Sequence, residues 1–176
     1  PFNNGVRADA TNDLGVNSSR FKDLYLSGGV YLGGTVAANL LDDYEEGSFT
    51  GTIADASTAG NTGSTHTGYY TKIGQLVTLT INCSDITTVG MTGTNTLYIQ
   101  GLPFTSTVQN VSAGAVRTDN VVFAGTRTFA VANVSANDTW ISFSVMGSGI
   151  SDTNITVNSL SAGSDIIVTI QYHTGS

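Results

Sequence analysis

The chain has 176 residues, which is enough for one domain with a substantial core, or for a short stem followed by one domain. Only 11% of the residues are charged, and the net charge is −7. This acidic balance excludes a nucleic-acid-binding surface, which needs clustered Lys and Arg, and no apolar run approaches the roughly 20 residues of a membrane-spanning helix.

The composition favours strands over helices. The chain has 21 glycines and many Thr, Ser and Asn residues, but only two glutamates, Glu45 and Glu46, and two lysines, Lys22 and Lys72. Exposed helical faces depend on Glu, Lys and Arg, whereas Thr is typical of the outer face of strands. We therefore expect an all-β protein with a hydroxyl- and amide-rich surface suited to work outside cells.

The N-terminal part predicts a thin stem. Residues 1–19 are polar and turn-rich, and residues 20–34 contain two short strand candidates, Leu24–Gly29 and Val30–Gly34, each closed by a glycine pair. Strands this short cannot bury a core alone, so we expect them to stack on other copies of the chain. The side chains expected in that stem contact are Phe21, Leu24, Tyr25, Leu26, Tyr31 and Leu32.

The next segment is expected to join the stem to a head. Residues 35–47 form this junction, with one helical turn within Thr35–Leu41 and then an acidic run that ends at Gly47. Residues 55–68 are small and polar, which predicts an exposed loop. We place the boundary after the junction, with a stem segment at 1–47 and a head domain at 48–176.

The head is expected to consist of strands separated by turns. The predicted strands are 75–83, 96–100, 120–124, 128–134, 139–145, 154–157 and 165–172. Three of them alternate clearly and predict the inward-facing set Val77, Leu79, Ile81, Cys83, Ile141, Phe143, Val145, Ile166, Val168, Ile170 and Tyr172. The single cysteine, Cys83, is thus interpreted as a buried apolar residue. Such spacing is typical of an antiparallel β-sandwich, here jelly-roll-like.

Four sequence blocks carry a resemblance to a known family. They are Arg20–Gly28, Leu41–Gly47, Gly68–Gly74 and Gly101–Phe104, and in this order they resemble segments at the C-terminal ends of tailed-bacteriophage tail-fibre proteins. The blocks cover a minority of the chain, and nothing after Thr105 is matched. Each block alone has low specificity, and the ordered set is more specific.

The resemblance implies a homotrimer with a β-rich stem and a head that binds a receptor, a surface glycan or a protein, on the host cell. It implies a non-enzymatic protein of the virion, exposed outside cells. Because the chain begins with Pro1 rather than Met, we expect the rest of the fibre to precede it. The alternatives are a capsid-decorating head fibre, a polysaccharide-depolymerising tailspike domain and a bacterial adhesin module.

Catalytic and metal sites find little support in the sequence. The acidic cluster Asp42, Asp43, Glu45 and Glu46 has oxygen ligands for Ca²⁺ but lacks EF-hand spacing. The alternative is a solvated junction, or an ion pair between subunits with Arg20, Lys22 or Lys72. Paired carboxylates occur in glycosidases, but the repeats that build a β-helical depolymerase are absent. His66 and His173 stand alone. We expect no enzyme activity, no cofactor and no metal.

The receptor-contact candidates lie outside the matched blocks. They are Trp140, Arg117, Asp119, Asn120, Arg127 and Asp152. Trp140 shares a strand face with Ser142 and Ser144, opposite the expected core, where an aromatic ring suits sugar stacking or an interface; the alternative is packing under a loop. Tyr69 and Tyr70 belong to a matched block and are interpreted as scaffold.

Overall fold

The computed structural model describes residues 14–107 and 111–175, and in them the protein is all-β. The chain divides into two compact units, the first ending at Leu40 and the second beginning at Leu41. The two short helical elements are single 3₁₀ turns, η1 (Ala37–Asn39) and η2 (Val157–Ser159). The turn-rich prediction for residues 1–13 lies outside the described residues.

The first unit contains little regular structure. Strand β1 (Val30–Tyr31) pairs with β2 (Leu40–Leu41) in a two-stranded sheet. The Leu32 amide donates to the Asn39 carbonyl at 2.9 Å, and the Asn39 side-chain amide donates back to the Leu32 carbonyl at 3.1 Å. The predicted strand at Val30 and the predicted helical turn are confirmed. The predicted strand at Leu24–Gly29 is wrong for the single chain, because no neighbouring strand lies beside it.

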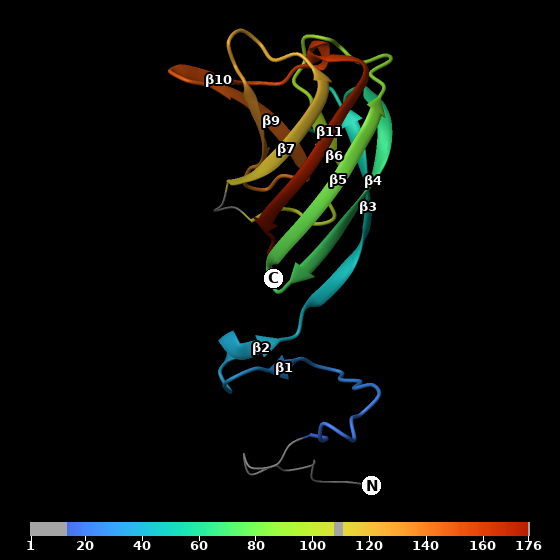
Figure 1. The fold of residues 1–176 in the computed structure, drawn as a ribbon, viewed down its shortest axis with the longest axis vertical. Coiled ribbons are helices and arrows are strands. Elements are labelled where there is room, and N and C mark those ends of the chain that lie inside the picture. The colour runs from blue at the N-terminus through green and yellow to red at the C-terminus, as the bar shows by residue number, and fades with distance from the viewer. Residues whose placement is uncertain (1–13, 108–110, 176) are drawn as a thin grey trace. The chain divides into compact units, whose positions relative to one another are not determined.

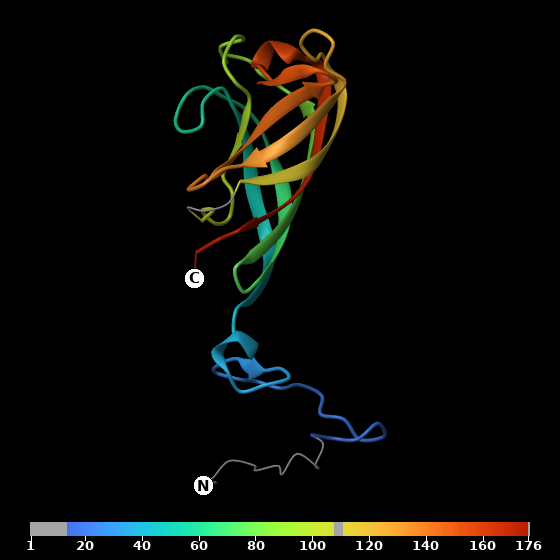
Figure 2. The same ribbon diagram turned by 90° about the vertical axis from the view of Figure 1, so that its left-hand side faces the viewer.

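The second unit is an eight-stranded antiparallel β-barrel. Its strands, in the order in which they pair around the ring, are β3 (Tyr44–Ala54), β4 (Thr62–Ile73), β5 (Leu76–Ile86), β11 (Leu160–His173), β7 (Ser112–Val121), β8 (Phe129–Val134), β9 (Trp140–Gly147) and β6 (Tyr98–Gln100). Strand β6 pairs with β3 and so closes the ring. Figure 1 shows β5 and β11 side by side, and Figure 2 shows β8 and β9 from another side.

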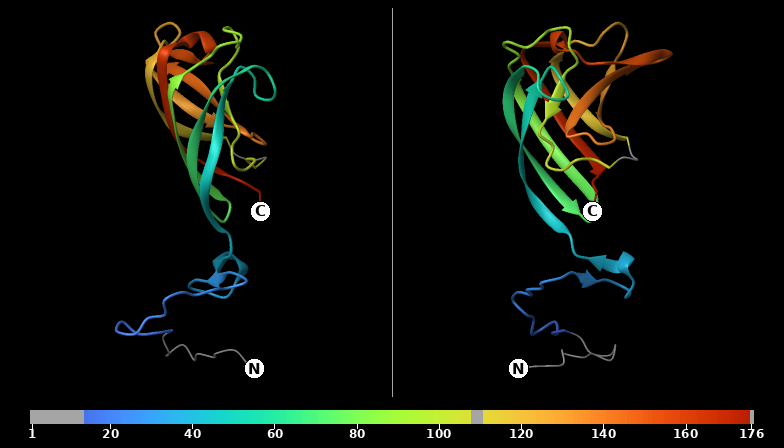
Figure 3. Two further views of the ribbon diagram at one scale, coloured as in Figure 1. Left: turned by 90° about the vertical axis from the view of Figure 1, so that its right-hand side faces the viewer. Right: turned by 180° about the vertical axis from the view of Figure 1, so that it is seen from behind.

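One further strand lies outside the ring. β10 (Ile150–Asn154) pairs only with β9, and this hairpin projects from the barrel wall (Figure 3, right). The expected sandwich of two separate sheets is not confirmed, because the β8–β9 and β3–β6 pairings join the strands into one closed sheet.

The barrel interior holds the core that the alternating strands predict. Every predicted inward side chain of β5, β9 and β11 is at most 1% exposed, including Cys83. Burial also raises the pKa of the Cys83 thiol to about 12, so the side chain is a packing residue and not a reactive thiolate. The core is completed by side chains of β3, β6 and β8 and of the connecting loops.

Four sequence predictions in this unit are corrected. The predicted junction and loop overlap two long strands, because β3 begins at Tyr44 and β4 at Thr62. The strand predicted at 120–124 instead ends at Val121, having begun at Ser112. The strand predicted at 154–157 lies earlier, at β10. In β3, β4 and β7 glycines occupy inward positions, so the aliphatic alternation that marks the other strands is missing.

Two of those glycines make room for the core. Gly68 on β4 lies opposite Phe49 on β3, and the Phe49 ring occupies the place that a Cβ at position 68 would need. Gly51 on β3 similarly leaves space for the side chains of Ile81 and Ile99. The inner wall at β3 and β4 is therefore built from glycine backbone covered by side chains of neighbouring strands.

We expect Gly68→Ala to lower the free energy of unfolding by about 1–3 kcal/mol, since the added methyl group must displace a buried aromatic ring. Equilibrium urea unfolding measures this change. Gly175→Ala is the matched control, because nothing lies within 4 Å of a Cβ at that position. Equal stability of the two variants would contradict the packing described here.

Candidate functional site on the outer face of the barrel

Five adjacent strands give the barrel a broad outer face. The strands β3, β4, β5, β11 and β7 are neighbours in this order, and their outward side chains align across the strands. One aligned row consists of Ser48, Tyr69, Thr80, Thr169 and Ala115. The next row consists of Glu46, Thr71, Thr78 and Gln171. The surface is dominated by hydroxyl and amide groups.

Besides Tyr44 at the start of β3, which is 59% exposed, the large aromatic side chain of this face is Tyr69. It is 64% exposed and stands between Ser48 on β3 and Thr80 on β5. Its neighbour Tyr70 points to the other side of the sheet, where its ring meets Phe104 edge-on at 5.2 Å and its hydroxyl donates to Glu45. The scaffold interpretation fits Tyr70, whereas Tyr69 adds an exposed ring to the surface.

Three shallow hollows follow one another across this face. The first, of about 460 Å³, is lined by residues of β3 and β4, and the second, of about 160 Å³, by residues of β4 and β5. The third, of about 250 Å³, is lined by residues of β5, β7 and β11. Tyr69 and Thr71 line both the first and the second hollow, and Thr78 lines both the second and the third. We call this series of hollows the transverse track.

Among the residues that line the three hollows, only Glu46, at the β3 end of the track, is charged. Glu46 lines the first hollow, and its carboxylate accepts a hydrogen bond from the Tyr44 hydroxyl at 3.1 Å, which raises the pKa of Tyr44. Arg117 is exposed on β7, on the same face as Ala115 and two residues further along the strand. Arg117 itself lines none of the three hollows.

The three predicted candidates on β7 have different surroundings. Arg117 lies beside the end of the transverse track, and Asp119 is exposed opposite Asp165. Asn120 has a left-handed backbone (φ 53°), and its side-chain amide donates to the Gly163 carbonyl at 3.3 Å. Asn120 thus makes a local contact between β7 and the Gly163 turn.

The other three candidates lie elsewhere on the barrel. The Arg127 guanidinium donates to the Ala124 carbonyl at 3.1 Å and to the Ser151 carbonyl at 2.7 Å, so it ties the β7–β8 turn to β10. Asp152 is exposed on β10. Trp140, at the start of β9, is half-buried opposite Gln100 of β6. The six sequence candidates therefore do not converge on one site.

The acidic cluster is largely engaged in local contacts. Asp43 forms an ion pair with Lys72, whose side chain is only 7% exposed and whose ammonium lies 5.5 Å from the centre of the Phe104 ring. The ion pair of Asp43 with Lys72 thus forms within one chain, whereas a contact between subunits was expected, and Glu45 accepts a hydrogen bond from Tyr70. Across residues 14–107 and 111–175 no three Asp, Glu, His or Cys side chains are grouped to hold a metal ion.

Buried polar groups hold the loop between β3 and β4. The Asp55 carboxylate accepts hydrogen bonds from the Thr92 amide at 2.7 Å and from the backbone and side-chain amides of Asn61 at 2.8 and 3.0 Å. The bond from Thr92, followed by those from Asn61, lowers the pKa of Asp55. His66 on β4 is half-buried, contacts the Ser64 hydroxyl at 2.9 Å, and has its pKa lowered by burial.

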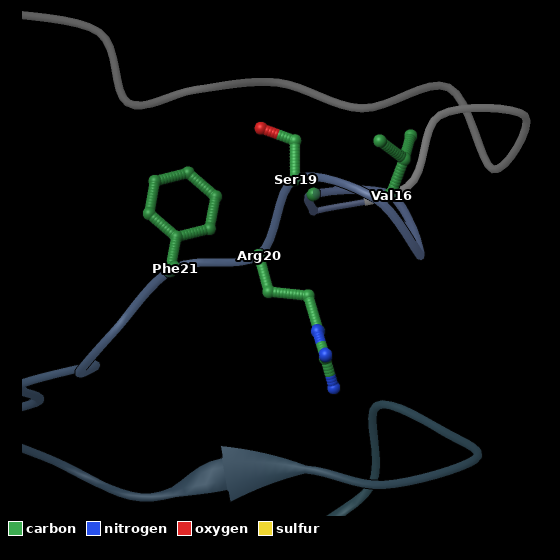
Figure 4. Close-up of a pocket in the computed structure, with 5 residues that line it drawn as sticks. Val16, Ser19, Arg20 and Phe21 are labelled. Carbon is green, nitrogen blue, oxygen red and sulfur yellow. The ribbon is translucent and has the colours of Figure 1, made fainter.

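A separate hollow of about 350 Å³ lies in the first unit (Figure 4). It is lined by Gly15, Val16, Ser19, Arg20 and Phe21, around a tight turn closed by reciprocal 2.9 Å hydrogen bonds between Val16 and Ser19. All of these residues come from one short stretch, and Phe21 is well exposed. The hollow is thus a surface of one turn, and we assign it no ligand.

No family model, curated protein or solved structure matches this chain. Among the described residues, no helix has the length and apolar character needed to cross a membrane. The function proposed below is therefore inferred from the chain's own residues and from the resemblance of its four sequence blocks.

We expect Asp43→Ala to lower the free energy of unfolding by about 1–3 kcal/mol, because it leaves the buried Lys72 ammonium without its carboxylate. The matched control is Asp42→Ala, a neighbouring exposed carboxylate, which should change stability by less than about 0.5 kcal/mol. Urea unfolding measures both. Equal effects would show that the Asp43–Lys72 ion pair contributes little.

His66 predicts a pH dependence of stability. Because its pKa is lowered below 6.5 in the folded protein, the unfolded chain binds the proton more tightly. The neutral His66 side chain therefore makes its full contribution to the free energy of unfolding above pH 6.5. This contribution is lost as the pH falls towards the lowered pKa of the folded protein. Across this pH range the melting temperature should fall less in His66→Gln than in the parent. In the control His173→Gln, at an exposed position, it should fall by as much as in the parent. Parallel curves for all three would contradict this.

Proposed function

We propose that this chain is the homotrimeric stem and receptor-binding head of a tailed-phage tail fibre, without enzyme activity and exposed on the virion. The stem would lie in the first unit, which ends at Leu40, and the head in the second, which contains all of β3. The proposal is carried by one observation above all, the set of large apolar side chains that the single chain leaves exposed in the stem. The resemblance of the four sequence blocks supplies the fibre family and the number three.

The exposed stem side chains favour self-association. Tyr25 is 90% exposed, and each of the other five predicted stem residues, namely Phe21, Leu24, Leu26, Tyr31 and Leu32, is at least half exposed. A β1–β2 pair of two residues per strand is too small to cover them. Exposed apolar side chains in this number are typical of protein interaction sites. Other copies of the chain expose the same side chains, so the copies can bury them against one another.

The head has properties that suit a fibre tip. Every strand of its ring has a hydrogen-bonded neighbour on both sides, which leaves no ring edge for uncontrolled pairing. Five strands of 10–14 residues form one wall, and three strands of 3–8 residues complete the ring. This difference in strand length between the two parts of the ring supports the further proposal of a flattened, jelly-roll-like barrel. A rigid wall of this kind can present a polar surface to a receptor.

The stem proposal is tested by the mass of the purified chain in solution, from light scattering behind a size-exclusion column. We expect a stable species of three times 18.2 kDa. The double variant Leu24→Asp with Tyr25→Asp should dissociate it, because three buried copies of each charge would face one another. Val122→Asp, an exposed apolar position in the head, should leave the mass unchanged. A well-folded monomer in the parent would overturn the proposal.

The receptor proposal is tested by adsorption of the labelled full chain to a panel of bacterial strains. We expect saturable binding to a minority of strains, with competition by the unlabelled chain. Each contact is expected to be weak, so the trimer should bind more tightly than the dissociated stem variant. Saturable binding to none of the strains, or equal binding to all of them, would count against a receptor-binding head.

A further inference from the structure

We propose that the transverse track binds a neutral, linear oligosaccharide that lies across the strands, with one sugar ring stacked on Tyr69. The inference rests on the proposed receptor-binding function and names its site and ligand class. None of the six residues suggested by the sequence is central to it, although Arg117 lies beside its end.

The shape of the track favours an extended ligand. Neighbouring hollows share lining residues, so the three lie in a row over β3, β4, β5, β11 and β7. Five strands spaced about 4.8 Å apart span roughly 19 Å, which exceeds a single sugar ring and suits a short chain of them. The hollows are shallow, unlike the enclosed apolar pockets that bury most of a small organic ligand.

The side chains along the track match the two kinds of surface that a sugar presents. Tyr69 lines both the first and the second hollow, and it is 64% exposed. The C–H face of a pyranose ring is apolar and packs on the face of an aromatic ring. Sugar hydroxyls need partners that both donate and accept, and the hydroxyls of Thr71, Thr78 and Thr80 do so.

The third hollow contains a pre-oriented polar group. The Gln171 side-chain amide donates to the Thr78 hydroxyl at 3.1 Å, so both side chains are held in position before a ligand arrives. Tyr69 and Thr78 also lie on strands paired on both sides, so the backbone beneath them is fixed. A site of this kind loses little conformational entropy on binding.

The charges indicate a neutral glycan. Glu46 is the one charged residue among those that line the three hollows, and the chain carries a net charge of −7, which repels polyanions. A second protein copy is a less suitable occupant of the track, because the side chains that line it around Tyr69 are mainly Thr, Ser, Gln and Ala, whereas the centre of a subunit interface is enriched in aromatic residues. The exposed Tyr44 and Ile73 of this face lie outside the three hollows. The geometry therefore favours a sugar over a subunit contact.

The test uses the full chain and an array of purified bacterial O-polysaccharides and capsular polysaccharides, together with neutral and acidic oligosaccharide fragments of them. Binding of the best fragment is then measured by calorimetry and by saturation-transfer NMR. We expect neutral fragments to bind, Tyr69→Ala to weaken binding at least tenfold, and Tyr69→Phe to retain it within about threefold, since the stacking ring is kept. Thr169→Arg should also block binding by filling the track.

Phe129→Ala is the matched control, since Phe129 is an exposed aromatic residue on β8, outside the track, and its removal should leave the affinity unchanged. All variants are compared at equal mass and melting temperature. Glycan binding that survives Tyr69→Ala and Thr169→Arg would overturn the site and leave the fibre function standing. Binding restricted to acidic fragments, or a change of oligomeric mass in Tyr69→Ala, would also overturn it.

Failure of the two proposals can be distinguished. Saturable adsorption to bacterial cells without binding to any glycan on the array would reject the oligosaccharide site and indicate a protein receptor. Absence of both adsorption and glycan binding would reject the receptor-binding function together with this site. Retained glycan binding by the dissociated stem variant would show that the track is complete within one chain.

Discussion

Closure of the sheet is the constraint on which the rest of the head depends. The three-residue strand β6 bridges β3 and β9, and the β8–β9 pairing completes the ring. Once the ring is closed, alternate side chains of every strand are directed either inward or outward. The inward set makes a continuous core, and the outward set makes the polar surface on which the transverse track lies.

Closure also demands small residues where strands curve towards one another. Gly51 and Gly68 leave the space that Ile81, Ile99 and Phe49 fill. Near the start of β3, aromatic and charged side chains replace aliphatic ones: Lys72 is buried against Phe104 and paired with Asp43, and the Tyr172 hydroxyl donates to the Phe104 carbonyl at 3.0 Å. Burial accordingly raises the pKa of Tyr172. A lysine can be buried there because its charge has a carboxylate and a ring beside it.

The two units differ in how far a single chain buries their apolar side chains. The barrel covers its core with its own strands, whereas the stem side chains of a single chain face solvent. This difference underlies the proposed division of labour, in which the stem assembles the fibre and the head makes contacts. On the head, one exposed aromatic residue among hydroxyl groups offers weak, specific contacts, which repetition of the chain in an oligomer can multiply.

The sequence by itself determined the all-β class and the inward faces of β5, β9 and β11, because aliphatic residues alternate with polar ones there. It did not reveal β3, β4 and β7, because glycine and polar residues interrupt the apolar side chains at their inward positions, and the fit of these residues depends on neighbouring strands. Likewise, the sequence did not show which of Tyr69 and Tyr70 faces outward. Adjacent residues of a strand face opposite sides of the sheet, and only the strand register places one of them outside. The transverse track joins five strands distant in sequence, so only the tertiary structure brought its residues together.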